Sequence, residues 1–215
     1  MIKAKKSLGQ NFLIDKNILN IIVDSTDIKN KTVLEIGPGT GNLTSYILKK
    51  KPKKLIVIEK DNELSNDLKK KFNSQLKIIN EDVLKIDETT LFNDKVTVFG
   101  NLPYNISTEI LSKWIINLKE NFWFECLILM FQKEVADRII AEFNTSNYGR
   151  LSILCNWKLN IKKICDIKPE AFTPKPKIDS SLLSFFPKKK FIKIKDANNL
   201  EKITRIFFNQ RRKML

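Results

Sequence analysis

Three glycines lie close together in the stretch EIGPGTG, at residues 35–41. The whole chain has only 6 glycines, and Gly37, Gly39 and Gly41 come at the end of an apolar, strand-like run. A turn without Cβ atoms lets the backbone approach a ligand closely, and it leaves free N–H groups where the next helix begins. A tight turn required by geometry alone would explain the same residues. The spacing is not the G-x-G-x-x-G of dinucleotide folds, because the third glycine comes one residue early.

Two carboxylates stand at the ends of the next two strand-like runs. Glu59 is the last residue of LIVIE, and Asp82 follows the run LKIIN. A carboxylate at the carboxyl end of the second strand can accept hydrogen bonds from a ribose diol. Asp82, in the matching place, could accept from an adenine amino group. Each acid alone is more often a solvated strand-end residue, but the repeated position favours an adenosine-containing cofactor.

A third unusual stretch is VFGNLPYNIS, at residues 98–107, where a β-branched, apolar run stops at a glycine. Gly100 and Asn101 alone would be enough to turn the chain. Pro103 and Tyr104 therefore need a separate explanation.

Strand-like and helix-like patterns alternate along the first two thirds of the chain. Short apolar runs predict strands at residues 32–37, 55–59, 76–80, 96–100 and 126–131. Helical spacing lies between them, at Leu43, Ile47 and Leu48, then Leu64, Leu68 and Phe72, then Ile110, Leu111, Trp114, Ile115 and Leu118. Strands separated by helices of this length predict right-handed βαβ crossovers and a mostly parallel sheet.

The pattern changes after Pro169. Residues 178–187 predict a further strand beside a proline-rich loop, antiparallel at an edge of the sheet. Residues 196–215 predict one basic amphipathic helix with Leu200, Ile203, Phe207 and Phe208 on one side.

Composition limits the partners and the chemistry. The formal net charge is +15, and lysines cluster at 49–54, 69–71 and 188–195, which favours a nucleic-acid partner. An A+T-rich genome would also produce this excess of lysine. The absence of histidine removes the commonest general base and metal ligand, and we expect no metal site. Three cysteines without C-x-x-C spacing and the lack of a membrane span or signal peptide predict a cytoplasmic protein.

Several motifs together resemble a known enzyme class. NLPY is similar to the [NDS]-x-P-[FYW] signature of S-adenosylmethionine-dependent methyltransferases that act on amino nitrogens. Over the whole chain, the sequence resembles the small-subunit (16S-type) ribosomal RNA adenine dimethyltransferases. The motifs that carry this resemblance are SLGQNFLID (7–15), EIGPGTGNLT (35–44), GNLPYNIS (100–107), QKEVADRI (132–139), YGRLSI (148–153), FTPKPKIDS (172–180) and FNQRRKML (208–215).

The resemblance implies a Rossmann-like, seven-stranded methyltransferase sheet in residues 1–187. Residues 188–215 would be a basic helical segment that begins a small, truncated or reduced helical C-terminal domain. The implied reaction is methylation of N6 of two adjacent adenosines near the 3′ end of small-subunit RNA, with S-adenosylmethionine converted to S-adenosylhomocysteine. The implied partner is this RNA, within a pre-30S particle, and we expect a monomer.

The resemblance also assigns site residues. Asn11 and Leu13 would close over the cofactor, and the turn of Gly37, Gly39 and Gly41 would hold it, with Gly37 against its methionine part. Glu59 would bind the ribose, and Asp82 with Val83 would lie at the adenine. Phe172 would be a second aromatic wall of the target pocket. On local grounds alone, Asn11 would be a helix cap and Phe172 a buried loop residue.

This assignment answers the question that NLPY raises. Asn101 and the backbone carbonyl of Leu102 can accept hydrogen bonds from an adenine amino group and aim its lone pair at the methyl donor. Pro103 would stiffen the turn. Tyr104 would offer a face for stacking of the flipped base, so that a phenylalanine there should serve almost as well. Asn101 would also lie beside the methionine end of the cofactor.

Two other functions remain open from the sequence. One is a large-subunit RNA adenine methyltransferase of the antibiotic-resistance type, against which FTPKPKIDS and FNQRRK argue. The other is an RNA-binding assembly or transcription factor that keeps the fold without catalysis, against which the intact glycine turn, Glu59, Asp82 and NLPY argue.

Overall fold

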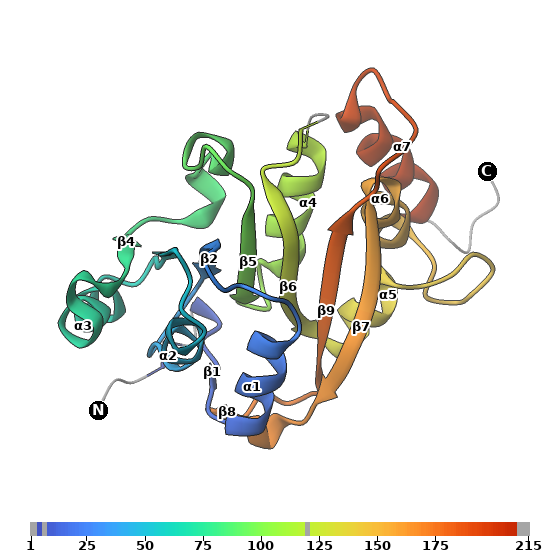
Figure 1. Ribbon diagram of the computed structural model, residues 1–215. Helices are drawn as coiled ribbons and strands as arrows, with labels where there is room; N and C mark the ends of the chain where they lie inside the picture. Colours follow the sequence, from blue (N-terminus) through green and yellow to red (C-terminus); the bar gives the residue numbers. More distant parts are fainter. Residues whose placement is uncertain (1–3, 6–7, 119–120, 210–215) are drawn as a thin grey trace.

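The computed structural model describes residues 4–5, 8–118 and 121–209. Seven strands form the central sheet in the order β4-β3-β2-β5-β6-β9-β7 (Figure 1). No helix in these described ranges is long and apolar enough to cross a membrane. The strands of the sheet are β2 (Thr32–Ile36), β3 (Lys54–Ile58), β4 (Lys77–Ile79), β5 (Val96–Asn101), β6 (Phe124–Gln132), β7 (Leu159–Ile167) and β9 (Ser180–Pro187).

The predicted α/β class with a mostly parallel, seven-stranded sheet is confirmed. β9 is the antiparallel strand, but it lies one position in from the edge, between β6 and β7. The strand at that edge is β7, which the apolar runs did not predict. Its residues alternate irregularly between buried and exposed, and its pairing with β9 shifts between Lys163 and Cys165. An edge strand of this kind carries no continuous apolar run, which is why the sequence pattern missed it.

Helices cover both faces of the sheet. Adjacent residues of a strand point to opposite faces, so Val33 packs toward α1, α2 and α3, whereas Leu34 packs toward α4, α5 and α6. Each layer is closed by buried aliphatic and aromatic side chains. The helices are α1 (Lys16–Asp24), α2 (Asn42–Lys49), α3 (Asn62–Phe72), α4 (Ser107–Asn117), α5 (Lys133–Ile139), α6 (Arg150–Lys158) and α7 (Ala197–Asn209).

A short second sheet joins two segments that lie far apart in the sequence. β1 (Phe12–Leu13) pairs antiparallel with β8 (Phe172–Thr173). The backbone N–H of Ile14 donates to the carbonyl of Ala171 at 2.8 Å and continues this pairing. The N-terminal segment is thereby held at the end of the main sheet where the parallel strands finish (Figure 1).

The C-terminal helix docks with other side chains than the apolar pattern predicts. α7 ends the described part of the chain at residue 209, and residues 210–215 of the predicted helix lie outside it. Leu200 packs against the core and Thr204 is buried, but Ile203 and Phe207 are exposed. The helix packs beside α6. An apolar stripe in the sequence does not tell which of its members a neighbouring helix will cover.

We expect Gly41→Ala to lower the free energy of unfolding by about 2 kcal/mol or more. Gly41 has a φ of 77°, and a Cβ atom there would lie 2.5 Å from Cε2 of Phe72 in α3. Gly149→Ala is the control, because Gly149 has an extended backbone with φ of −176°. Urea unfolding of both variants tests this. Equal losses at the two positions would contradict the packing role of Gly41.

Candidate active site

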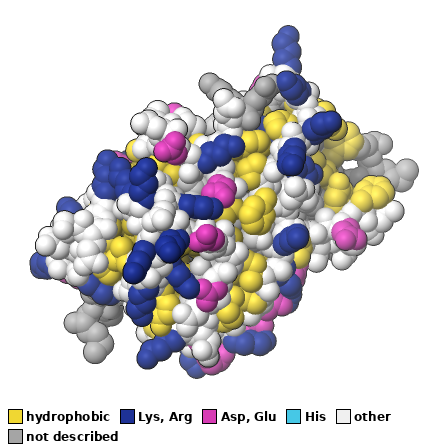
Figure 2. Space-filling model, in the orientation of Figure 1, with side chains coloured by type: hydrophobic (Ala, Val, Ile, Leu, Met, Phe, Trp, Pro, Cys, Tyr) yellow, Lys and Arg dark blue, Asp and Glu magenta, His cyan; other side chains and the backbone are white. Residues whose placement is uncertain are grey.

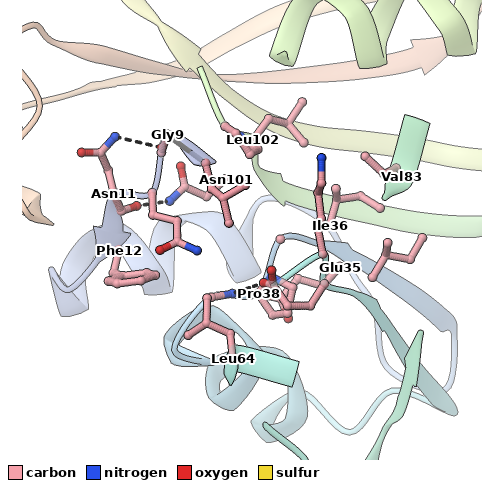
Figure 3. A pocket seen from close by; sticks show the side chains of 18 of the residues that line it. Gly9, Asn11, Phe12, Glu35, Ile36, Pro38, Leu64, Val83, Asn101 and Leu102 are labelled. Atoms are coloured by element: carbon pink, nitrogen blue, oxygen red, sulfur yellow. Dashed lines mark hydrogen bonds between the residues drawn. The ribbon is translucent and has the colours of Figure 1, made fainter. Parts of the chain in front are cut away.

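A pocket lies where the parallel strands end, between the glycine turn, the N-terminal segment and the loop after β5 (Figure 3). Most residues predicted for the site line it. They are Asn11, Leu13, Gly37, Gly39, Glu59, Asp82, Val83, Asn101, Leu102, Pro103 and Tyr104. These residues come from the N-terminus and from the ends of four neighbouring strands, and the fold therefore brings together positions that are far apart in the sequence.

Two predicted residues lie outside the pocket. Gly41 caps α2 and lies against Phe72 and Leu68 of α3, so its missing side chain serves helix packing rather than contact with a ligand. Phe172 is only 1% exposed and belongs to the core, where its backbone pairs with Leu13. Phe172 is therefore a buried residue, as its local sequence predicts, and it does not form a wall of the pocket.

The glycine turn is shaped for close approach. Gly37 and Gly39 have φ values of 63° and 57°. Residues other than glycine rarely adopt such values. A Cβ atom on Gly39 would lie 2.8 Å from Cδ1 of Phe12. The absence of this atom lets the N-terminal segment lie directly on the turn.

Glu59 holds the turn from the neighbouring strand. Its side chain is buried, with 6% exposure. Oε2 accepts a hydrogen bond from the backbone N–H of Gly39 at 3.1 Å, and Oε1 accepts from that of Asp61 at 2.9 Å. Burial raises the pKa of Glu59, and these two donors act in the opposite direction. A carboxylate oxygen can accept more than one hydrogen bond, so both oxygens retain acceptor capacity toward the pocket.

Asp82 lies at another part of the pocket wall. Oδ1 accepts from the backbone N–H of Leu84 at 3.0 Å, and Oδ2 is 2.8 Å from the ammonium of Lys60. The hydrogen bond from Lys60 lowers the pKa of Asp82, although partial burial opposes it. Asp82 is therefore a fixed, ionised acceptor beside the apolar side chain of Val83.

Asn101 is oriented by the N-terminal segment. Its Nδ2 group donates to the backbone carbonyl of Asn11 at 2.8 Å, and Figure 3 shows the side chain pointing toward that segment. Because the amide nitrogen is engaged there, the amide oxygen is the group left to accept a hydrogen bond. The side chain of Leu102 is buried at 1% exposure and anchors the next residue of the loop.

Two contacts at the site were not predicted. The hydroxyl of Tyr104 lies 2.5 Å from Oγ of Ser180. Asp61 caps α3 and also accepts hydrogen bonds from Lys5 and Gln10, which fastens the N-terminal segment to that helix. Both contacts join distant parts of the sequence, and no local pattern signals them.

Glu35 is a third residue that sequence reasoning passed over, although it opens the glycine motif. It is 1% exposed, and Oε2 accepts a hydrogen bond from Oγ1 of Thr44 at 2.7 Å. Burial raises the pKa of Glu35 to about 8. At neutral pH the side chain is therefore mostly protonated behind the turn.

Comparison with known proteins decides the family. The family model described as ribosomal RNA adenine dimethylase matches residues 1–215. The chain belongs to this family. Its activity is therefore the dimethylation of adenine in ribosomal RNA, and the predicted enzyme class is confirmed.

Relatives of this dimethylase carry consistent names. The chain is 72% identical over 214 residues to "Ribosomal RNA small subunit methyltransferase A" of Pelagibacter ubique (strain HTCC1062), covering 100% of the dimethylase and 82% of the relative. It is 46% identical to the protein of the same name from Ehrlichia ruminantium (strain Gardel), with the same coverage of both chains.

Solved structures agree with the fold. A dimethyladenosine transferase from Plasmodium falciparum matches with a TM-score of 0.81 and 33% identity, over 95% of the dimethylase and 73% of that chain. The 23S rRNA methyltransferase ErmE matches with a TM-score of 0.72 and 22% identity, over 93% of the dimethylase and 80% of that chain. The second likeness shows a shared fold alone.

We expect the stability of the dimethylase to fall between pH 4.5 and about 8 because of Glu35. Its pKa is raised from 4.5 to about 8, so the folded state binds more protons than the unfolded state within this window. Glu35→Gln should remove this part of the pH dependence and make the variant relatively more stable at pH 8 than at pH 5. Urea unfolding across this range tests the expectation. Parallel curves for the parent and the variant would contradict it.

Proposed function

We propose that this dimethylase transfers methyl groups from S-adenosylmethionine to N6 of two adjacent adenosines near the 3′ end of small-subunit (16S) ribosomal RNA. The products are N6,N6-dimethyladenosine and S-adenosylhomocysteine. The observation that carries the proposal is the orientation of Asn101. Its amide nitrogen is held by the carbonyl of Asn11, so its oxygen is available at the pocket as an acceptor for an amino group.

The pocket fits the proposed cofactor. The acceptor oxygens of Glu59 suit the two hydroxyls of a ribose, and Asp82 suits an adenine amino group beside Val83. At Gly37 the nearest atom to an added Cβ would be the backbone oxygen of Asn101, 3.9 Å away. That open space suits the methionine part of the cofactor. S-adenosylmethionine supplies, when bound, an electrophilic methyl group on a positively charged sulfur.

The protein acts on the target base by placement. The lone pair of adenine N6 is delocalised into the ring, which makes it a weak nucleophile. In the first transfer, Oδ1 of Asn101 and the carbonyl of Leu102 each accept an N6 hydrogen, which draws the nitrogen toward a pyramidal geometry. In the second transfer the methylated nitrogen has one hydrogen, and one of the two acceptors binds it. As the sulfur–methyl bond breaks and the nitrogen–methyl bond forms, the nitrogen becomes cationic and acidic, and its proton then passes to solvent water. No strong base is needed for this order of events, which suits a chain without histidine.

Tyr104 supplies the stacking surface of this proposal. It follows Pro103 in the loop between β5 and α4 and lines the same pocket as Asn101. A flipped adenine could lie against its ring while the amino group reaches Asn101. Phe172 has no role in this stacking, because it lies in the core.

The basic surface suits the RNA partner. Lysine runs 49–54 and 69–71 belong to the end of α2, the start of β3 and the last turns of α3. Figure 2 shows Lys and Arg side chains gathered on the left of the view, over the part of Figure 1 that holds α2, α3 and β4. Such a surface favours phosphate contacts that are independent of base sequence.

The setting of the reaction belongs to the same proposal. The enzyme would act as a monomer in the cytoplasm, on RNA within a pre-30S particle. The division of the chain into a catalytic part, 1–187, and the start of a C-terminal helical domain, 188–215, remains a prediction.

The cofactor site is tested by Glu59→Ala. We expect the affinity for S-adenosylmethionine to fall by about 1.5 to 3 kcal/mol, because hydrogen bonds to a charged group are lost. Calorimetry measures this directly. Glu59→Gln keeps an acceptor and should lose less, while Glu125→Ala, whose carboxylate pairs with Lys31 away from the pocket, should bind like the parent. An unchanged affinity in Glu59→Ala would remove Glu59 from the cofactor site.

The reaction is tested by methyl incorporation into small subunits that lack the modification. The parent should dimethylate them, and Asn101→Ala should be roughly 100-fold slower or worse, a loss of about 3 kcal/mol of transition-state stabilisation. RNA affinity should barely change. Asn117→Ala, at the opposite end of α4, is the matched control. A parent that leaves this RNA unmodified would reject the proposed substrate, and a fully active Asn101→Ala would reject the alignment role.

A further inference from the structure

The side chain of Tyr104 is tied to a strand far away in the sequence. Its hydroxyl lies 2.5 Å from Oγ of Ser180, and either hydroxyl is able to donate the hydrogen bond. Ser180 is fully buried and is the first residue of β9. Burial raises the pKa of Tyr104 above its ordinary value of 10.0, although the hydrogen bond with Ser180 acts in the opposite direction.

The antiparallel direction of β9 makes this contact possible. Parallel strands β5 and β6 both end at the edge of the sheet that carries the pocket, at Asn101 and Gln132. Because β9 runs the other way, its first residue lies at that same edge, where Ser180 pairs with Gln132. The two hydroxyls therefore meet across the end of β6.

Ser180 is a rigid anchor. Its backbone is paired on one side with β6 and on the other with β7, where it lies opposite Ile167. The preceding residue is held as well, because the carbonyl of Asp179 accepts the backbone N–H of Lys133 at 2.9 Å. Because the backbone of Ser180 is fixed on both sides, its hydroxyl can restrain the side chain of Tyr104.

Tyr104 needs such an anchor. The backbone of its loop is fixed by the N–H of Ile106, which donates to the carbonyl of Pro103 at 3.1 Å, and by Oγ of Ser107 on the carbonyl of Tyr104 at 3.3 Å. Those bonds leave the two side-chain torsions of Tyr104 undetermined. The hydroxyl oxygen lies on the axis of the second torsion, so its contact with Ser180 fixes the direction in which the ring points. The preference of a phenolic O–H for the plane of its ring then favours one rotation about that axis.

We propose that Ser180 is a positioning residue of the methyl transfer. Through the hydroxyl of Tyr104 it fixes where the ring lies against which the target adenine stacks, and so the distance of N6 from Oδ1 of Asn101. This inference rests on the proposed function. It differs from the expectation that a phenylalanine at position 104 serves almost as well, because here the hydroxyl takes part in holding the ring.

A double-mutant cycle tests the proposal. Single-turnover methylation is measured at saturating cofactor and RNA for Tyr104→Phe, Ser180→Ala and the double variant. We expect each single variant to be about 10-fold slower, since small misplacements of reacting groups cost this much or more. The double variant should be no slower than either single one. Cofactor affinity should stay that of the parent.

Two further variants separate positioning from structure. Ser180→Thr keeps the hydroxyl and should recover most of the rate. Ser181→Ala removes a buried hydroxyl from the next residue of β9, one that donates to Asp166 at 2.6 Å instead of contacting Tyr104, and should turn over like the parent. Thermal unfolding checks each variant. If Ser180→Ala does not fold, Tyr104→Phe removes the same contact by a change at the half-buried residue.

Several results would overturn the proposal. Parental rates in Tyr104→Phe or Ser180→Ala would do so, and so would losses that multiply in the double variant. If the parent itself fails to modify small-subunit RNA, the proposed function fails separately. The contact is then judged by amide hydrogen exchange, which Ser180→Ala should accelerate in residues 101–106, and unchanged exchange would reject it.

Discussion

The buried carboxylate of Glu59 is the contact on which the pocket depends. It joins the end of β3 to the glycine turn through Gly39 and to the start of α3 through Asp61. A buried carboxylate is costly unless hydrogen bonds satisfy it, and here the donors are backbone N–H groups of the structures that it joins. The acceptor that would bind a ribose is therefore also the group that holds the turn in place.

The contacts of Glu59 continue through Asp61 to the N-terminal segment. Asp61 accepts hydrogen bonds from Lys5 and Gln10, and the pairing of β1 with β8 holds Phe12 against the turn. The carbonyl of Asn11 then fixes the amide of Asn101. These contacts connect Glu59 and the glycine turn to Asn101 through the N-terminal segment.

The sequence predicts the interior of this fold better than its edges. β2, β3 and β5 are buried on both faces, and their apolar runs could be recognised without further information. β7 is exposed on part of its surface and could not. The site residues at strand ends were predictable because parallel strands end together, but the motifs containing Gly41 and Phe172 do not show which way a residue faces. The contact of Tyr104 with Ser180 depends on strand order, which no local pattern contains.

The proposed mechanism of methyl transfer by placement accounts for a pocket that is built from fixed groups. A weak nucleophile that receives no help from a base gains most from correct distance and angle, and these are properties of the scaffold. Asn101 is held by the backbone of Asn11, and Tyr104 is held by Ser180 on an antiparallel strand. If β9 ran parallel to β6, its first residue would lie at the opposite edge of the sheet. In the proposed function, the reversal of β9 therefore belongs to the target site as much as NLPY does, because it delivers a rigid hydroxyl to the edge where the parallel strands end.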